Sequence, residues 1–328
     1  MKRSNLSDCN VLVTGGLGFI GSTLTRRLIQ LGANVTVIDS LIPESGGNLF
    51  NISGFEKKIH ISISDIRDSG KISDLIRGQD YLFNLAAQTS HLDSLQDPFT
   101  DLDINCRGQI ILLEACKEMN PDIRIVFTST RQIYGKPQYL PVDEKHPLQP
   151  VDPNGITKAA GEWYHTLYSN VYGIKTSILR LTNTYGPRMR IKDARQNFLG
   201  WWVHQVIQGQ PIDVWDGRQL RDFTYVDDVV DALMIAATDE SACGQVFNVG
   251  GEEPVTLKSL AELLIRVNGS GDYHIKEYPQ ERRRIDIGDF YTGYSRITKC
   301  LKWRPEVQLE AGLTRTLDYF RQYKDHYL

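Results

Sequence analysis

Apolar runs rich in β-branched residues alternate, in the first half of the chain, with longer stretches in which apolar side chains recur every three or four positions. The first run is VLVTGG at residues 11–16, and the next is VTVIDS at residues 35–40. Between them, Ile20, Leu24 and Leu28 fall on one face of a predicted helix. The spacing therefore predicts a strand, a helix and a second strand, in that order.

The same alternation continues to about residue 186. Further strand-like runs are HISISDI at 60–66, YLFNLAAQ at 81–88, RIVFTST at 124–130 and KTSILRLTNTYG at 175–186, with helical stretches around Leu75, at 111–116 and at 159–168. Most of these runs are almost continuously apolar, as parallel strands buried on both faces are. The pattern predicts an α/β fold built on a doubly wound parallel sheet.

Beyond residue 186 the alternation loosens, which predicts a second, smaller α+β lobe. PRMRIKDARQ at 187–196 is polar and basic, FLGWWVHQVIQG at 198–209 has the spacing of an amphipathic helix, and DGRQLRDF at 216–223 reads as a polar loop. We therefore assign residues 1–180 to the first lobe, with a later return near 222–250. Residues 181–328 mainly form the second lobe.

Composition and charge narrow the function classes. The chain has 41% hydrophobic and 23% charged residues and a formal net charge of -3, so charge gives no reason to expect nucleic acid as a partner. No apolar stretch has the length of a membrane span. Five cysteines without CxxC spacing argue against a disulfide framework and against a zinc site. A cytoplasmic protein without a bound metal is expected.

Three glycines, Gly15, Gly18 and Gly21, follow the first predicted strand and open the first predicted helix. Glycine lets the backbone pass close to a pyrophosphate, and the helix start offers unpaired N–H groups to the anion. Asp39 lies 39 − 21 = 18 positions after the last glycine, at the end of the second strand. A carboxylate there accepts hydrogen bonds from a ribose and repels a 2′-phosphate, which favours NAD over NADP.

The ordered motifs of the chain resemble those of a known family. They are TGGLGFIGS, the Asp65-Ile66-Arg67 triplet, NLAAQ, TSTRQIYG, the helix at 155–162, RLTNTYGPR, RDFTYVDDVVDA and VFNVGG. Together they resemble the extended short-chain dehydrogenase/reductases, the NAD-dependent nucleotide-sugar epimerases and dehydratases. The resemblance runs from Val11 to the C-terminal helix, and it implies a Rossmann-type cofactor domain and a nucleotide-sugar pocket in the second lobe.

The resemblance also implies roles for particular residues. The implied cofactor contacts are Gly15, Gly18, Phe19, Ile20, Gly21, Asp39, Asp65, Ile66, Leu85, Ala86, Ala87 and Lys158. The implied contacts to the nucleotide-diphosphate sugar are Gln88, Ser94, Thr130, Asn183, Arg221 and Arg284. Planar guanidinium groups bind phosphate oxygens in pairs, which suits a diphosphate.

The catalytic positions carry one departure from the family pattern. The family has a Tyr-x-x-x-Lys pair and an upstream Ser or Thr, whereas this chain has Thr130, Asn154 and Lys158 at the three places. An amide does not titrate near neutral pH, so Asn154 orients a substrate but cannot act as a general acid or base. Asparagine is also a good helix cap, and capping explains the presence of Asn154 as well as a variant active site does.

Three chemical explanations for the asparagine stay open. Proton transfer passes to a bound water or to His91, Tyr185 or the Lys158 amine, none of which the sequence places. Alternatively, the protein binds NAD and the sugar without turnover. The third explanation is a substitution introduced to trap a complex.

The residues after Thr130 bear on the reaction. The family's 4,6-dehydratases have an Asp-Glu pair where this chain has Arg131 and Gln132. Arginine stays protonated and glutamine does not titrate, so water elimination is disfavoured. We expect oxidation at the sugar C4 with epimerisation as the net outcome. The alternatives are a catalytically impaired protein that binds the nucleotide sugar and NAD, and a 4-dehydrogenase or dehydratase of the same family. The resemblance also implies a homodimer built on helices near 104–119 and 159–171.

Overall fold

A computed structural model describes residues 6–43, 45–251, 253–278 and 286–328, and in this part of the chain seven parallel strands form one sheet. The strands are β1 (Asn10–Thr14), β2 (Asn34–Asp39), β3 (Ile59–Ile63), β4 (Tyr81–Asn84), β5 (Arg124–Thr130), β6 (Lys175–Leu181) and β11 (Val246–Val249). Their order across the sheet is β11-β6-β5-β4-β1-β2-β3. The chain thus winds outward in both directions from β1 and β4, which confirms the predicted doubly wound fold.

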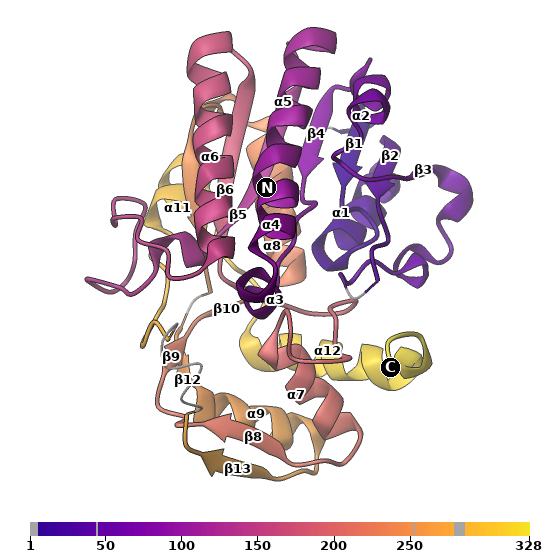
Figure 1. Cartoon of the computed structure of the whole chain (residues 1–328). Helices are drawn as coiled ribbons and strands as arrows, with labels where there is room; N and C mark the ends of the chain where they lie inside the picture. Colours follow the sequence, from indigo (N-terminus) through magenta and orange to yellow (C-terminus); the bar gives the residue numbers. More distant parts are fainter. Residues whose placement is uncertain (1–5, 44, 252, 279–285) are drawn as a thin grey trace.

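Helices cover both faces of the sheet. One face carries α1 (Phe19–Gln30), α8 (Val226–Thr238) and α11 (Ser295–Leu301), and the other carries α2 (Ser69–Ile76), α5 (Gly108–Met119) and α6 (Pro153–Tyr172). Figure 1 shows α5 and α6 side by side in front of the sheet, with α8 behind it. Two short helices, α3 (His91–Gln96) and α4 (Pro98–Leu102), precede α5 and pack against α6.

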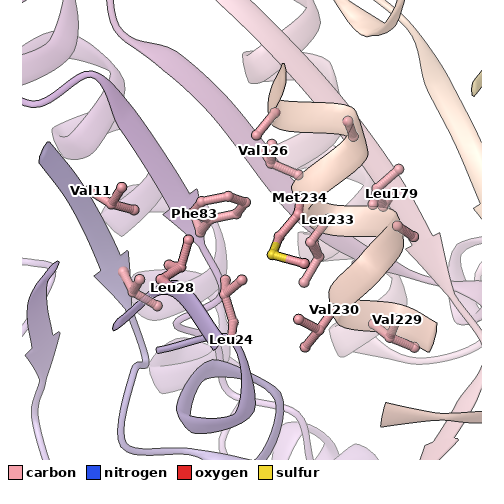
Figure 2. Packing of buried hydrophobic residues seen from close by; sticks show 14 of the residues in the cluster. Val11, Leu24, Leu28, Phe83, Val126, Leu179, Val229, Val230, Leu233 and Met234 are labelled. Carbon is pink, nitrogen blue, oxygen red and sulfur yellow. The ribbon is translucent and has the colours of Figure 1, made fainter. Parts of the chain in front are cut away.

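Side chains on alternate strand positions build the two cores. On one face, Val11 and Phe83 pack with Leu24 and Leu28 of α1 and with Met234 of α8 (Figure 2). On the other face, a separate cluster joins buried strand residues to α2, α5 and α6. Burial on both faces explains why the strands read as continuous apolar runs.

The second lobe is smaller and mixed in structure. It contains the helices α7 (Phe198–Ile207), α9 (Leu257–Asn268) and α12 (Leu309–Tyr323) and the short strands β7 (Asn183–Tyr185), β8 (Ile212–Trp215), β9 (Leu220–Arg221), β10 (Phe223–Tyr225), β12 (Val255–Thr256) and β13 (Tyr273–Lys276). Its core includes Trp202 of α7, Leu260 of α9 and Phe320 of α12. Figure 1 shows α7, α9, β8 and β13 below the large sheet.

Two strand predictions and one loop prediction differ from the structure. The run at 81–88 leaves the sheet after Asn84, because the amides of Leu85 and Ala86 both donate to the Thr14 hydroxyl, each at 3.0 Å. The run at 175–186 divides into β6 and β7, and β7 pairs with β10 instead of the large sheet. The loop predicted at 216–223 contains β9, which pairs with β12.

Among the described helices, none has the length and apolar character needed to cross a membrane. The predicted division assigns residues 1–180, with a return near 222–250, to the cofactor and mainly residues 181–328 to the nucleotide sugar. This division stays a prediction.

Candidate active site

The turn between β1 and α1 is shaped to receive an anion. Gly15 has φ +68°, and a Cβ on Gly21 would collide with the Gly15 carbonyl oxygen, so side chains are excluded from both positions. The N-cap of α1 is Gly18, which makes no side-chain capping hydrogen bond, and the first turn of α1 holds no acidic residue. The N–H groups at this helix start therefore face the turn without a competing side chain.

Two carboxylates lie at the carboxyl ends of the neighbouring strands β2 and β3, and both line the same cavity as the turn. Asp39 ends β2, with Oδ1 accepting from the Leu41 amide at 3.0 Å and Oδ2 accepting from the Leu17 amide at 3.1 Å. Burial raises the Asp39 pKa against the opposing effect of these two amides. Asp65 instead forms a bidentate pair with Arg67, with Nη2 2.8 Å from Oδ2, and the hydrogen bonds from Arg67 lower the Asp65 pKa.

A cavity of about 510 Å³ extends from the glycine turn to the second lobe. Most of the predicted site residues line it, namely Gly15, Gly18, Phe19, Ile20, Gly21, Asp39, Asp65, Ile66, Leu85, Ala86, Ala87, Gln88, Thr130, Asn154, Lys158, Asn183 and Arg221. The volume is within the range of about 300–1,000 Å³ that is usual for ligand sites. The sheet edge and the second lobe therefore share one cavity.

Two predicted substrate residues stand apart from this set. Ser94 is buried in α3 and is not among the lining residues; its hydroxyl donates to the backbone carbonyl of His91 at 2.8 Å. Arg284 lies outside the described residues. Both assignments stay predictions.

Lys158 lies on α6 and points to the carboxyl end of β5. Its Nζ donates to the Thr128 carbonyl at 2.6 Å and lies 4.4 Å from the centroid of the Phe127 ring. Burial lowers the Lys158 pKa to about 8, although Glu162 and Asp101 act in the opposite direction. The ammonium group can thus lose its proton close to physiological pH.

Asn154 is buried, and its amide nitrogen is bound within the protein. Nδ2 donates to the Gln88 carbonyl at 2.8 Å and to Asp101 Oδ1 at 3.0 Å. The cap of α6 is Asp152, whose Oδ1 accepts from the Gly155 amide at 2.7 Å. The interpretation of Asn154 as the helix cap is therefore wrong, because an acidic residue two positions earlier takes that role.

The turn after β5 brings Thr130 and Arg131 to the cavity. Thr130 Oγ1 accepts from the Gln132 amide at 3.3 Å. Arg131 Nη2 donates to Asn183 Oδ1 at 3.3 Å, and its guanidinium lies 5.2 Å from the centroid of the Phe290 ring. Burial, with a smaller effect of the Arg221 charge, lowers the Arg131 pKa to about 10, so the group stays cationic at neutral pH.

The second lobe contributes polar and basic groups. Arg221 is buried and donates from Nη1 to the Leu220 carbonyl at 2.8 Å and to the Gly288 carbonyl at 2.5 Å. Arg190 and Arg195 also line the cavity and were not singled out from the sequence. Both belong to segment 187–196. The sequence shows that this segment is basic, but only the fold shows that it lies at the cavity.

The structure separates the three side chains considered for proton transfer. Tyr185 does not line the cavity; it is buried, and its hydroxyl donates to the Leu309 carbonyl at 3.3 Å. Lys158 and His91 both line the cavity. His91 Nδ1 lies 2.5 Å from Asp152 Oδ2.

Among the residues that the structure describes, no group of three or more His, Cys, Asp or Glu side chains could hold a metal ion. The residues at the glycine turn do fit a dinucleotide. The turn excludes side chains, the helix start is uncapped, and Asp39 stands at the end of the neighbouring strand.

Comparisons with known proteins agree with this geometry. The model of the NAD dependent epimerase/dehydratase family matches residues 11–250. A UDP-glucose 4-epimerase from Mycolicibacterium smegmatis is 31% identical over 316 residues, covering 94% of this chain and 98% of that protein.

Two solved structures have the same fold over nearly the whole chain. UDP-glucose 4-epimerase from Thermotoga maritima, solved with UDP-glucose, has a TM-score of 0.87 at 31% identity and covers 96% of this chain and 99% of its own. UDP-glucose 4-epimerase from Thermus thermophilus, solved in complex with NAD, has a TM-score of 0.85 at 30% identity, with coverages of 95% and 99%.

Proposed function

Since this chain belongs to the NAD-dependent epimerase/dehydratase family, we propose that it interconverts the C4 epimers of a nucleotide-diphosphate sugar. Its cofactor is NAD, and its substrate class is the nucleotide sugars. The observation that carries the proposal is the single cavity that joins the glycine turn to Asn183 and Arg221 of the second lobe. A cofactor and a sugar diphosphate held in one cavity can bring their reacting atoms together.

We assign the cofactor to residues 1–180, with the return near 222–250, and the sugar mainly to residues 181–328. The N–H groups at the start of α1 bind the pyrophosphate, and Asp39 accepts from the adenosine ribose. Lys158 donates to the nicotinamide ribose. Bound NAD supplies the acceptor, and later the donor, of the hydride at the sugar C4.

On the sugar side, Thr130 offers a hydroxyl that orients the C4 oxygen. Arg221 and Asn183 face the diphosphate, and Arg190 adds a further guanidinium along the cavity wall. Arginine is suited to this task because its planar fork binds phosphate oxygens in pairs.

Arg131 and Gln132 favour epimerisation over dehydration. Elimination of water needs a base for the C5 proton and an acid for the leaving hydroxyl. A guanidinium that stays charged and an amide that does not titrate supply neither group next to Thr130. Reversible oxidation at C4 needs neither of them.

The test is incubation of the purified protein with UDP-, GDP- and CDP-hexoses, with products resolved by NMR. Appearance of the C4 epimer of one substrate, dependent on NAD, is the expected result. Loss of water from the sugar would assign another reaction of the family. No product from any hexose, with the nucleotide sugar bound, would contradict epimerase activity.

A binding protein without turnover is the second candidate, and the observation in its favour is Asn154. Its Nδ2 donates to the Gln88 carbonyl and to Asp101, and an amide does not titrate. In that case wild type would bind NAD and nucleotide sugar without product, while Asn154→Tyr would gain turnover or also remain inert. Product from wild type would exclude this candidate.

We further propose a homodimer. Ile156, Trp163, Leu167 and Val171 form an exposed apolar stripe along one face of α6, and Phe99 on the adjacent α4 is also exposed. Contiguous exposed apolar surface of this kind is typical of a protein interface. Exposed apolar residues Leu95 on α3 and Leu102 on α4 lie in the adjoining helices, and the contribution expected from residues 104–119 stays a prediction.

A further inference from the structure

Oxidation at C4 needs a group that takes the hydroxyl proton, and Asn154 cannot do this. We propose that His91, oriented by Asp152, is the general acid–base that transfers this proton. The inference rests on the proposed function, since it names the group that completes the reaction at the same site.

His91 is placed to reach a ligand. It is the first residue of α3, it lines the cavity, and its side chain is 25% exposed. Nδ1 lies 2.5 Å from Asp152 Oδ2, and within the described part of the chain Nε2 makes no hydrogen bond to protein. A carboxylate only accepts, so Nδ1 carries the hydrogen and Nε2 is left with a lone pair for a substrate hydroxyl.

Asp152 holds the imidazole in this orientation. Its side chain is 5% exposed, with one oxygen on the Gly155 amide and the other on His91. Burial acts to raise the Asp152 pKa, but the hydrogen bond and charge of His91, the Gly155 amide and the Arg131 charge together lower it. Asp152 is therefore ionised at neutral pH and stabilises the imidazolium that forms.

The asparagine supports the same arrangement. Asn154 fixes the loop after β4 to the start of α6 through its bond to the Gln88 carbonyl, and the His91–Asp152 pair fixes the same loop three residues later. Two bonds to positions 152 and 154 at the start of α6 thus determine where His91 lies. Asn154 in this way positions a residue that does the work expected of the family's tyrosine.

The other cavity candidate is less suitable. Lys158 is committed to the Thr128 carbonyl and to the face of Phe127. In its charged form it has no lone pair to accept a proton. Its ammonium group is better suited to a ribose hydroxyl.

The step balances as follows. The O–H bond at C4 breaks, its proton bonds to His91 Nε2, and its electron pair becomes the second C–O bond of the ketone. The C–H pair at C4 leaves as hydride to oxidised NAD. In the return step the carbonyl oxygen takes the proton back from the imidazolium as the hydride returns to the opposite face.

The decisive variant is His91→Asn. The asparagine amide keeps a donor near the position of Nδ1, so the bond to Asp152 is retained while the titrating nitrogen is lost. We expect kcat to fall by about 10²- to 10⁴-fold, with KM and the affinity for NAD unchanged. His60→Asn is the matched control, because His60 is exposed on β3, and it should leave kcat unchanged.

Two further variants separate chemistry from structure. Asp152→Asn retains a good capping residue and removes the charge, so kcat should fall at unchanged KM. Combined with His91→Asn it should cause little further loss, because the two residues act as one unit. Asn154→Tyr on the His91→Asn background should restore part of kcat.

A readout independent of turnover is the NMR signal of the His91 imidazole, assigned by its loss in His91→Asn. It should shift when a UDP-hexose is added and not when UDP alone is added. Wild-type activity with an equally active His91→Asn variant would overturn this inference alone. A wild type inert toward every nucleotide hexose would overturn the proposed function and the inference together. If His91→Asn also loses affinity for NAD, its kcat no longer tests the proton transfer. The wild-type imidazole signal then decides, and a signal that does not shift with the UDP-hexose would overturn the inference.

Discussion

Arg180 on β6 and Glu162 on α6 form a buried bidentate ion pair, with Nε 3.0 Å from Oε1 and Nη2 2.6 Å from Oε2. Their side chains are 7% and 4% exposed. Arg180 also donates from Nη1 to the Tyr134 hydroxyl at 2.8 Å. Because Glu162 lies one turn after Lys158, this pair fixes the helix that presents Lys158 to the cavity.

Glu162→Gln should destabilise the protein. The variant leaves the Arg180 guanidinium buried without its counter-charge, and breaking such a pair is expected to lower the free energy of unfolding by about 3 kcal/mol. Urea denaturation measures the change. The control is Glu310→Gln, which removes the exposed Arg266–Glu310 pair between α9 and α12 and should change the same quantity by less than about 1 kcal/mol. Equal losses from the two variants would contradict a special role of the buried pair.

Gly21→Ala should abolish NAD binding. The added Cβ would collide with the Gly15 carbonyl oxygen, so either the turn or the start of α1 must move. Calorimetric titration with NAD is the measurement. Gly70→Ala on α2 is the matched control, because its Cβ would meet nothing nearer than 3.6 Å, and it should bind NAD as wild type does. Normal NAD affinity in Gly21→Ala would place the pyrophosphate elsewhere.

The glycine turn, Asp39 and the sheet were predictable because local sequence determines them. A strand, a tight turn and a helix are specified by neighbouring residues, and buried strands show in the apolar pattern. The His91–Asp152 and Arg131–Asn183 contacts join residues 61 and 52 positions apart, so they depend on how separate loops meet. The loop at 85–88 was mistaken for strand because its amides bind a side chain, Thr14, which periodicity does not reveal.

The affinity for NAD should fall as the pH rises through about 8. Burial lowers the Lys158 pKa to about 8, so the folded protein loses this charge before an unfolded chain does. Below this pH the ammonium group donates to the ribose with its full charge. Titration at about pH 7 and about pH 9 should show roughly tenfold weaker binding at the higher value.

Lys158→Gln is the control for this pH effect, because its NAD affinity should be weak and almost constant with pH. The same lowered pKa of Lys158 predicts that the stability of the protein changes with pH in the opposite direction to its NAD affinity. Between about pH 8 and the usual lysine pKa of about 10.4, the unfolded chain binds more protons, so stability should rise with pH in that window. Wild-type NAD affinity that does not change between the two pH values would contradict the role assigned to Lys158.

Trp163→Glu should convert the proposed dimer to a monomer. Trp163 is 66% exposed in the centre of the α6 stripe, and a carboxylate there would be desolvated without a partner at an apolar interface. Size-exclusion chromatography with light scattering gives the molar mass. Ile275→Glu places the same charge on β13, where Ile275 is also exposed, and should not change the mass. A monomeric wild type would remove the dimer from the proposal.

Asn154→Asp should make stability depend on pH in a way that tests the amide's role. Asn154 Nδ2 faces two acceptors, the Gln88 carbonyl at 2.8 Å and Asp101 Oδ1 at 3.0 Å. A carboxylate would present an acceptor to both groups and a like charge to Asp101, so the pKa of the new carboxyl should be raised in the folded state. Stability from its protonated form is fully present below the unfolded pKa of about 3.9 and is lost as the pH rises through the raised folded value.

Urea denaturation at about pH 4 and about pH 7 should therefore show Asn154→Asp close to wild type at the lower pH and destabilised by about 3 kcal/mol at the higher. Asn170→Asp is the matched control, because Asn170 is exposed on the same helix, and it should match wild type at both values. Asn154→Ala should be destabilised equally at both, since it removes the donor without adding a titrating group. An Asn154→Asp protein as stable as wild type at neutral pH would contradict the donor role assigned to the Asn154 amide.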